Sequence, residues 1–213
     1  MRAADARRDL VVESIDLHDG SLRFVRPRDP AVLLDLEDVA VDEAYPPFWA
    51  QLWPSGVELA HRVSTHDRTG TSVVELGCGL GLPAVAAALA GATVLATDRA
   101  PDALTFTAAN ARANHARVET ALCSWDASGP LVARGPWQLV LASDVLYERR
   151  NSDQLIDLLP RLVTDDGAVW IADPGREMVP EFLAATRAGW RTVEVVPTRR
   201  QDVQIIRLAG PPR

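Results

Sequence analysis

The sequence predicts an α/β protein built on a doubly wound, mostly parallel sheet. Apolar runs of strand length alternate with longer alanine-rich or amphipathic segments, as in sheets covered by helices on both faces. One such run, 73–76, leads into a glycine-rich loop at 77–81 and then into an alanine-rich segment. Ligands of these sheets bind beyond the carboxyl ends of the strands. That rule selects Glu75, Gly77, Asp98, Trp125, Asp144 and Asp173.

The first 45 residues are expected to form an N-terminal arm in front of an α/β domain spanning 46–213. Residues 1–20 are polar and are expected to be frayed or loosely docked. Residues 21–26 partly alternate between apolar and polar, which favours a strand that Pro27 ends. Residues 31–44 fit either a short helix or an extended segment.

Within the domain, apolar periodicity and turn residues give the order of the elements. Helices are expected at 55–64, 82–90, 101–114, 151–163 and 179–188. Strands are expected at 73–76, 93–97, 118–122, 137–144, 168–172, 192–196 and 202–208. We expect a loop at 127–136, a turn at 165–167, and a hairpin formed by the last two strands.

The glycine loop points to a particular class of ligand. Its glycines, Gly77, Gly79 and Gly81, stand at alternate positions, whereas a dinucleotide fingerprint needs its third glycine where Leu82 stands. A phosphate-binding P-loop needs a lysine, and the chain contains none. The carboxylate of Glu75 would repel a pyrophosphate, but it tolerates or attracts through water the cationic methionine end of S-adenosylmethionine.

Asp98 ends the next expected strand, where a carboxylate can accept hydrogen bonds from both ribose hydroxyls. Glu-x-Gly-x-Gly-x-Gly followed by an aspartate at this distance resembles the class I methyltransferases, which use S-adenosylmethionine. The alternative is a glycine turn in some other α/β protein.

Bulk composition narrows the function. The net charge of −7 and the pI of about 5.1 argue against a general nucleic-acid binder. All 22 basic residues are arginines, which suggests a GC-rich, bacterial genome. Two isolated cysteines favour a reducing cytoplasm, and the four scattered histidines indicate no metal site. The charged N-terminus is not typical of a signal peptide, and no apolar run is long enough to span a membrane.

Several side chains at the strand ends have both a binding and a structural interpretation. Trp125 fits either an adenine-stacking role or a core role, and for Asp126 the structural interpretation is favoured. Asp144 fits an ammonium-binding role better than a helix-capping role, because of its place after a strand. Tyr147 fits either the mouth of a methyl-transfer channel or simple packing. Asn110 and Asn114 favour helix capping over ligand binding.

Three motifs narrow the resemblance further: 47–56 (PFWAQLWPSG), 143–147 (SDVLY) and 173–176 (DPGR). Together they resemble the seven-strand protein-lysine methyltransferases, most of all the branch that methylates the electron-transfer-flavoprotein β subunit. Trp49 and Trp53 lie in the first motif; both fit a buried patch, and Trp53 also fits the methionine end of the cofactor. One departure is that Leu82-Pro83 follows the glycines, where the family often has a small residue.

This resemblance implies a seven-stranded sheet whose last strand runs antiparallel, with S-adenosylmethionine as cofactor and a protein lysine as methyl acceptor. Asp144 and Tyr147 would lie near the substrate. The cofactor would lie at Trp53, Glu75, Gly77, Gly79, Gly81, Asp98, Trp125 and Asp144.

The acceptor itself stays open at this point. The electron-transfer-flavoprotein β subunit is one candidate protein substrate, and a small-molecule N- or O-methyltransferase is an alternative on the same fold. A non-catalytic cofactor-binding subunit is a third possibility, against which the presence of Glu75, Asp98 and Asp144 argues. Neither a nucleic-acid nor a membrane partner is expected, and the sequence does not indicate an oligomeric state.

Overall fold

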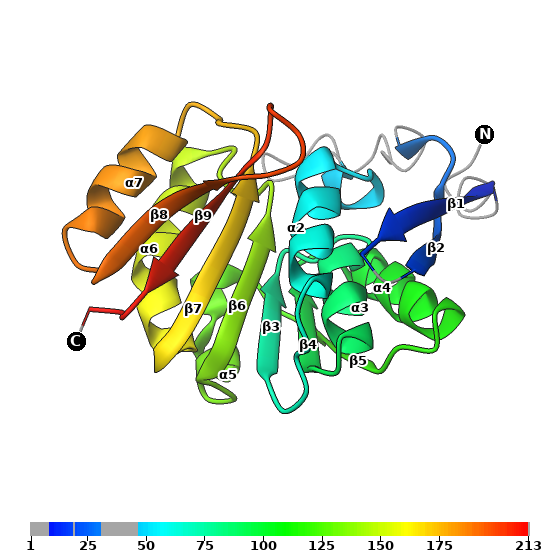
Figure 1. Cartoon of the computed structure of the whole chain (residues 1–213), viewed down its shortest axis with the longest axis horizontal. Helices are drawn as coiled ribbons and strands as arrows, with labels where there is room; N and C mark the ends of the chain where they lie inside the picture. The colour runs from blue at the N-terminus through cyan, green and yellow to red at the C-terminus, as the bar shows by residue number, and fades with distance from the viewer. Residues whose placement is uncertain (1–8, 19, 31–46, 213) are drawn as a thin grey trace.

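A computed structural model describes residues 9–18, 20–30 and 47–212 (Figure 1). A seven-stranded sheet in the order β5-β4-β3-β6-β7-β9-β8 runs through it. Its first five strands pair in parallel, and β9 runs antiparallel to both of its neighbours. The strands are β3 (Ser72–Leu76), β4 (Thr93–Asp98), β5 (Val118–Leu122), β6 (Trp137–Ser143), β7 (Val163–Asp173), β8 (Thr192–Pro197) and β9 (Gln204–Ala209). The predicted sheet is confirmed.

Helices cover both faces of this sheet (Figure 1). One core cluster joins the central strands to residues of α2 and α3, and a second joins their other face to α6 and α7. The central strands are therefore buried on both sides, which explains their nearly continuous apolar sequence. The helices are α2 (Pro54–Ser64), α3 (Leu82–Leu89), α4 (Pro101–Ala113), α5 (Gly129–Val132), α6 (Arg149–Leu162) and α7 (Val179–Arg187).

The N-terminal region contains a hairpin of β1 (Leu10–Leu17) and β2 (Gly20–Pro27). The strand at β2 was expected, but the expectation of a frayed 10–17 is wrong. Only Ile15 of β1 is buried, and apolar and polar residues do not alternate regularly along the strand, so pairing with β2 defines it. The expected element at 31–44 lies outside the described residues.

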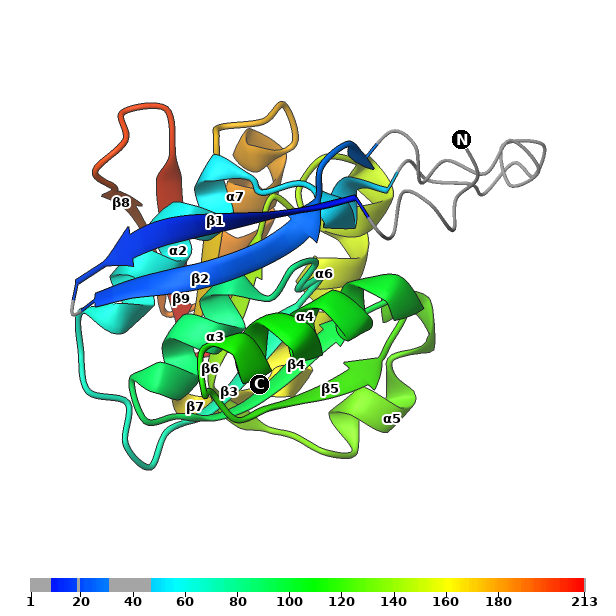
Figure 2. The same ribbon diagram turned by 90° about the vertical axis from the view of Figure 1, so that its right-hand side faces the viewer.

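The hairpin lies across α2, α3 and α4 (Figure 2). Two asparagines of the α4 segment bind it to the domain. The Asn110 side chain accepts from the Val25 N–H at 2.8 Å and donates to the Val25 carbonyl at 3.2 Å. Asn114 does the same for Arg23, at 2.9 and 2.8 Å. Asn114 also donates to the Asn110 carbonyl in the last turn of the helix, so the predicted capping role is part of its function.

Two local predictions need correction. The predicted loop at 127–136 begins at the last residue of η4 (Trp125–Ala127) and contains the short helix α5. The predicted turn at 165–167 lies inside β7, where the register against β6 shifts between Trp137↔Val163 and Leu139↔Ala168. Extra residues in one strand make such a bulge, and its Asp-Asp-Gly sequence has the composition of a turn.

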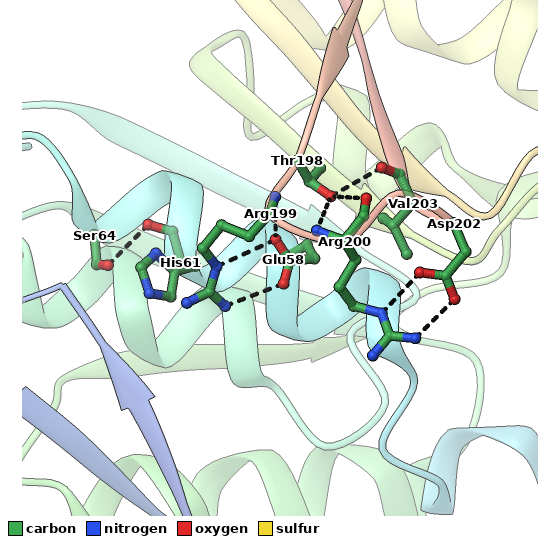
Figure 3. A network of polar contacts seen from close by, with 8 residues as sticks. All are labelled: Glu58, His61, Ser64, Thr198, Arg199, Arg200, Asp202 and Val203. Atoms are coloured by element: carbon green, nitrogen blue, oxygen red, sulfur yellow. Dashed lines mark hydrogen bonds and ion pairs between the residues drawn. The ribbon is translucent and has the colours of Figure 1, made fainter.

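The turn between β8 and β9 lies at the carboxyl edge of the parallel strands, and α2 holds it there. Glu58 on α2 is buried, and its carboxylate accepts from the Arg199 backbone N–H at 3.1 Å and from Arg199 Nη2 at 3.0 Å (Figure 3). The neighbouring Arg200 instead pairs with Asp202 inside the turn. The buried carboxylate of Glu58 and its guanidinium partner thus fix this turn to α2.

Candidate functional site

The glycine loop between β3 and α3 adopts a backbone shape that its glycines permit. Gly77, Gly79 and Gly81 have φ angles of +64°, +53° and +80°, a region that glycine enters at little cost. A Cβ on Gly81 would lie 2.5 Å from Thr107 Cγ2, and one on Gly79 would lie 3.0 Å from the Trp49 carbonyl oxygen. Close approach of neighbouring chain therefore demands glycine here independently of φ.

Glu75 lies at the end of β3 and is fully buried. Its Oε2 accepts from the Ala84 N–H at 2.8 Å, so the carboxylate caps the first turn of α3, in which Pro83 also lies. Its Oε1 is buried without a hydrogen-bond partner in the described part of the chain. Burial raises the pKa of Glu75 well above its usual range. Such an orphaned oxygen is a ready acceptor for a ligand donor.

Asp98 ends β4 and holds the glycine loop from the opposite side. Its Oδ2 accepts from the Gly79 N–H and its Oδ1 from the Ala100 N–H, both at 2.9 Å. Burial raises the pKa of Asp98. A backbone hydrogen bond from Arg99 also acts on this carboxylate, so at least one of its roughly four lone-pair sites remains for a further donor such as a ribose hydroxyl.

Trp125 opens η4, directly beyond the carboxyl end of β5. Its Cζ2 lies 3.6 Å, and Val145 Cγ1 3.4 Å, from the position of a Cβ on Gly77. The indole also packs against the main core cluster, so it has a structural role whatever binds there. Asp126 accepts hydrogen bonds from Ser124 and Arg150, in line with the structural interpretation of this residue.

Asp144 follows β6 in a left-handed conformation, with φ +57°. Aspartate tolerates this region better than most residues. Its Oδ1 accepts from Arg176 Nη2 at 2.6 Å, and its Oδ2 is buried without a hydrogen-bond partner among the described residues. The side chain is 8% exposed, so this second oxygen faces a nearly dry environment.

The 173–176 motif places the guanidinium that binds Asp144. Asp173 Oδ1 accepts from the N–H groups of Gly175 and Arg176, both at 2.8 Å, and closes a tight turn after β7. Asp173 Oδ2 lies 3.8 Å from Arg176 Nε. Two buried carboxylates therefore flank one guanidinium. From the sequence, this motif fits either a plain turn or part of the substrate site, and the strand-end rule selects Asp173 but not Arg176.

An aromatic wall stands beside this ion pair. The Arg176 guanidinium lies 5.8 Å from the Trp53 ring centroid, and Trp53 Nε1 donates to the Phe48 carbonyl at 3.0 Å. Phe48 makes edge contacts with Trp53 at 6.2 Å and with Tyr147 at 5.9 Å. Trp49 packs instead on Phe106 in the cluster beneath the hairpin. The two motif tryptophans thus separate, one to the site and one to the core.

All predicted site residues gather at one edge of the sheet. One group surrounds the glycine loop and the other surrounds Asp144. Val145 links the two groups, because it follows Asp144 and its Cγ1 lies 3.4 Å from the position of a Cβ on Gly77. The site combines apolar side chains with the carboxyl groups of Glu75 and Asp98, which retain the capacity to accept hydrogen bonds. This combination suits a nucleoside with a cationic tail. Within 9–18, 20–30 and 47–212, no group of three metal-ligating side chains occurs, and no helix is long and apolar enough to cross a bilayer.

A model of lysine methyltransferases matches residues 46–183 of this sequence. The chain belongs to the lysine methyltransferase family. The resemblance inferred from the three motifs is thereby confirmed.

Relatives within and around this family differ in their acceptors. The chain is 35% identical over 136 residues to the electron transfer flavoprotein beta subunit lysine methyltransferase of Xenopus laevis, which is 61% of this chain and 53% of that protein. It is 31% identical over 166 residues to protein N-lysine methyltransferase METTL21A of Danio rerio, and the match covers 74% of this chain and 76% of that protein. It is 30% identical over 111 residues to human histone-arginine methyltransferase METTL23, and the match covers 49% of this chain and 58% of that protein. The chain spans about half the length of the Xenopus relative.

Solved structures of methyltransferases share the fold. The 16S rRNA N2 G1207 methyltransferase of T. thermophilus, solved with AdoMet and guanosine, aligns with a TM-score of 0.69 at 13% identity, over 96% of this chain and 51% of that one. A TehB-like SAM-dependent methyltransferase from Corynebacterium glutamicum aligns with a TM-score of 0.58 at 14% identity, over 72% of this chain and 87% of that one. At this identity the likeness concerns the fold alone.

Proposed function

We propose that this lysine methyltransferase family member transfers a methyl group from S-adenosylmethionine to a lysine amine on a protein. The observation that carries the proposal is the state of Asp144. One of its oxygens binds Arg176, and the other is buried without a hydrogen-bond partner among the described residues, at the edge of the sheet where the glycine loop begins. A buried polar atom without a partner is costly, and a substrate amine would satisfy it.

The cofactor would lie across the two groups of site residues. When bound, S-adenosylmethionine supplies a methyl group on a positively charged sulfur. Asp98 would accept from the ribose, Trp125 would pack on the adenine, and the backbone of the loop at 77–81 would lie along the methionine portion. Behind that loop, the unpaired Oε1 of Glu75 would be available to accept a hydrogen bond from the ligand, and Trp53 would close the methionine end.

The lysine must arrive with a free lone pair, although its ordinary pKa is about 10.4. The aromatic wall of Phe48, Trp53 and Tyr147 would remove water from the amine, which lowers its pKa. A bare carboxylate beside it would act in the opposite direction. Because Arg176 offsets the charge of Asp144, the carboxylate can orient the amine without strongly favouring the ammonium form. Alignment of amine and methyl group then provides most of the rate gain.

We propose residues 46–213 as the catalytic domain, with 1–45 as an arm that contributes to substrate choice; the family match that begins at residue 46 supports this boundary. The free thiols of Cys78 and Cys123 support a cytoplasmic location, and an arginine-only set of basic residues supports a bacterial source.

The test is methylation of protein in a lysate that lacks the endogenous enzyme. Purified chain and labelled S-adenosylmethionine should label one or a few protein bands, and hydrolysis should release methylated lysine. The electron-transfer-flavoprotein β subunit is the first purified acceptor to try. Since the chain has no lysine, the enzyme alone should stay almost unlabelled. Label confined to small molecules, or released as methylarginine, would overturn the lysine assignment.

A further inference from the structure

A cavity lies on the sheet face beside the C-terminal end of α2. Its volume is about 230 Å³. We call it the arginine cavity, and its lining residues are Arg62, His66, Arg68, Trp170, Val196, Ile205 and Arg207. It lies on the same face of the sheet as α2, because Trp170 and Ile205 pack with residues of α2 in one core cluster. Trp170 precedes Asp173 by three residues, whereas Ile205 pairs with Ala172, so the cavity extends along the sheet toward the carboxyl edge.

The floor of the cavity is formed by side chains on one face of the sheet. Trp170 and Arg207 are register partners on β7 and β9, and Ile205 pairs with Val196 of β8, which places these side chains on one face of the sheet. The Arg68 guanidinium stacks 4.8 Å from the centroid of the Trp170 ring. Stacking of this kind fixes the orientation of an otherwise mobile cation.

The cations of the cavity are only partly compensated by acids. None of the seven lining residues is acidic. Arg207 pairs with Glu194 at 3.3 Å, but both side chains are about half exposed, so the pair is weak. Asp67, next to His66, directs its carboxylate to the N–H and hydroxyl of Thr69. In a protein of net charge −7, clustering of three arginines around one cavity calls for an anion.

Arg68 is the most informative member of this set. Its Nε is buried and has no hydrogen-bond partner among the described residues. Burial, together with the nearby Arg62 guanidinium, lowers the pKa of Arg68. Both facts describe a cation that lacks its counter-charge, and an anion in the cavity would supply one.

We propose that the arginine cavity binds the carboxylate or phosphate group of an organic anion whose flat apolar portion rests on Trp170 and Ile205. Planar guanidinium groups suit both oxyanions, because they donate paired hydrogen bonds. The volume lies below the range of roughly 300–1,000 Å³ that is typical of larger ligand pockets. It therefore fits a small molecule, or a single acidic or phosphorylated side chain of the acceptor protein.

The experiment is calorimetric titration of phenyl phosphate into protein saturated with S-adenosylhomocysteine, so that the carboxyl-edge site is blocked. Phenyl phosphate should bind, and benzyl alcohol, which lacks the charge, should not. Arg62→Gln and Arg68→Gln should each weaken binding by about tenfold or more. Arg161→Gln, which changes an exposed arginine of α6 on the opposite face, should leave it unchanged.

Equal affinity of the wild type and both cavity variants, or no binding of phenyl phosphate, would overturn the proposal. Arg62 is exposed in the last turn of α2, so its variant tests the cavity even if Arg68→Gln is poorly folded. A methylation assay then identifies the source of the anion. A rise in acceptor KM at constant kcat in Arg62→Gln assigns the anion to the acceptor, and an unchanged KM assigns it to a free ligand. The binding test needs no turnover, so it is independent of the methyl acceptor.

Discussion

Arg176 Nη2 lies 2.6 Å from Asp144 Oδ1, and this ion pair joins the loop after β7 to the end of β6. The carboxylate is nearly buried and the guanidinium is 30% exposed. Arg176 therefore screens Asp144 from solvent on one side and leaves Oδ2 for a substrate. This relationship leads directly to the first of four predictions.

Asp144→Asn should reduce kcat at least a hundredfold while leaving the fold intact. Asparagine tolerates the left-handed backbone of this position, so the change removes the charge with little strain. The measurement is single-turnover methylation with circular dichroism as a fold check, and Asp153→Asn, on the exposed side of α6, is the matched control. A variant with the parent rate would place amine binding elsewhere.

Asp98→Ala should weaken binding of S-adenosylhomocysteine by roughly 1.5–3 kcal/mol, because charge-assisted hydrogen bonds are lost. Calorimetry gives the affinity, and Asp157→Ala on α6 serves as the control. Asp98→Asn separates two contributions, since it can still accept from the Gly79 N–H but lacks the charge. Unchanged affinity in a folded Asp98→Ala protein would contradict the proposed ribose contact.

Glu75→Gln should alter the pH dependence of stability. Burial raises the pKa of Glu75 above its unfolded value of about 4.5, so its contribution is present below that pH and is lost as pH rises toward the folded pKa. Without cofactor, the free energy of unfolding of the wild type should therefore fall relative to the variant, by up to about 1.4 kcal/mol per pH unit. Urea denaturation from pH 5 to 8 measures this, with exposed Glu119→Gln as control. Parallel pH curves would show that Glu75 is ionised in the folded protein.

Arg199→Ala should destabilise the protein by about 1–3 kcal/mol, because it leaves the buried Glu58 carboxylate without its guanidinium partner. Its neighbour provides the matched control: Arg200 pairs with Asp202, both side chains are exposed, and Arg200→Ala should have little effect. Urea denaturation of both variants makes the comparison (Figure 3). Equal midpoints for the two would contradict a stabilising role of the Glu58 pair.

Sequence reasoning succeeded where local pattern and burial agree. Strand β3 could be predicted because both of its faces are buried, and the glycine loop because its backbone requires residues without a Cβ. β1 could not be predicted, because its apolar and polar residues do not alternate regularly and only its pairing with β2 defines the strand. The Arg176–Asp144 pair joins residues 32 positions apart, and only the fold brings them together.

Asn110 gives the N-terminal hairpin a connection to cofactor binding. Its amide binds Val25 of β2 and also donates to the carbonyl of Leu80, inside the glycine loop, at 3.0 Å. The Asn110 side chain thus forms hydrogen bonds to both the hairpin and the glycine loop. Because coupling between two sites is reciprocal, a cofactor whose binding is strengthened by the docked hairpin stabilises that docking by the same free energy. The exchange rate of the Val25 amide proton therefore reports on whether the cofactor site is loaded.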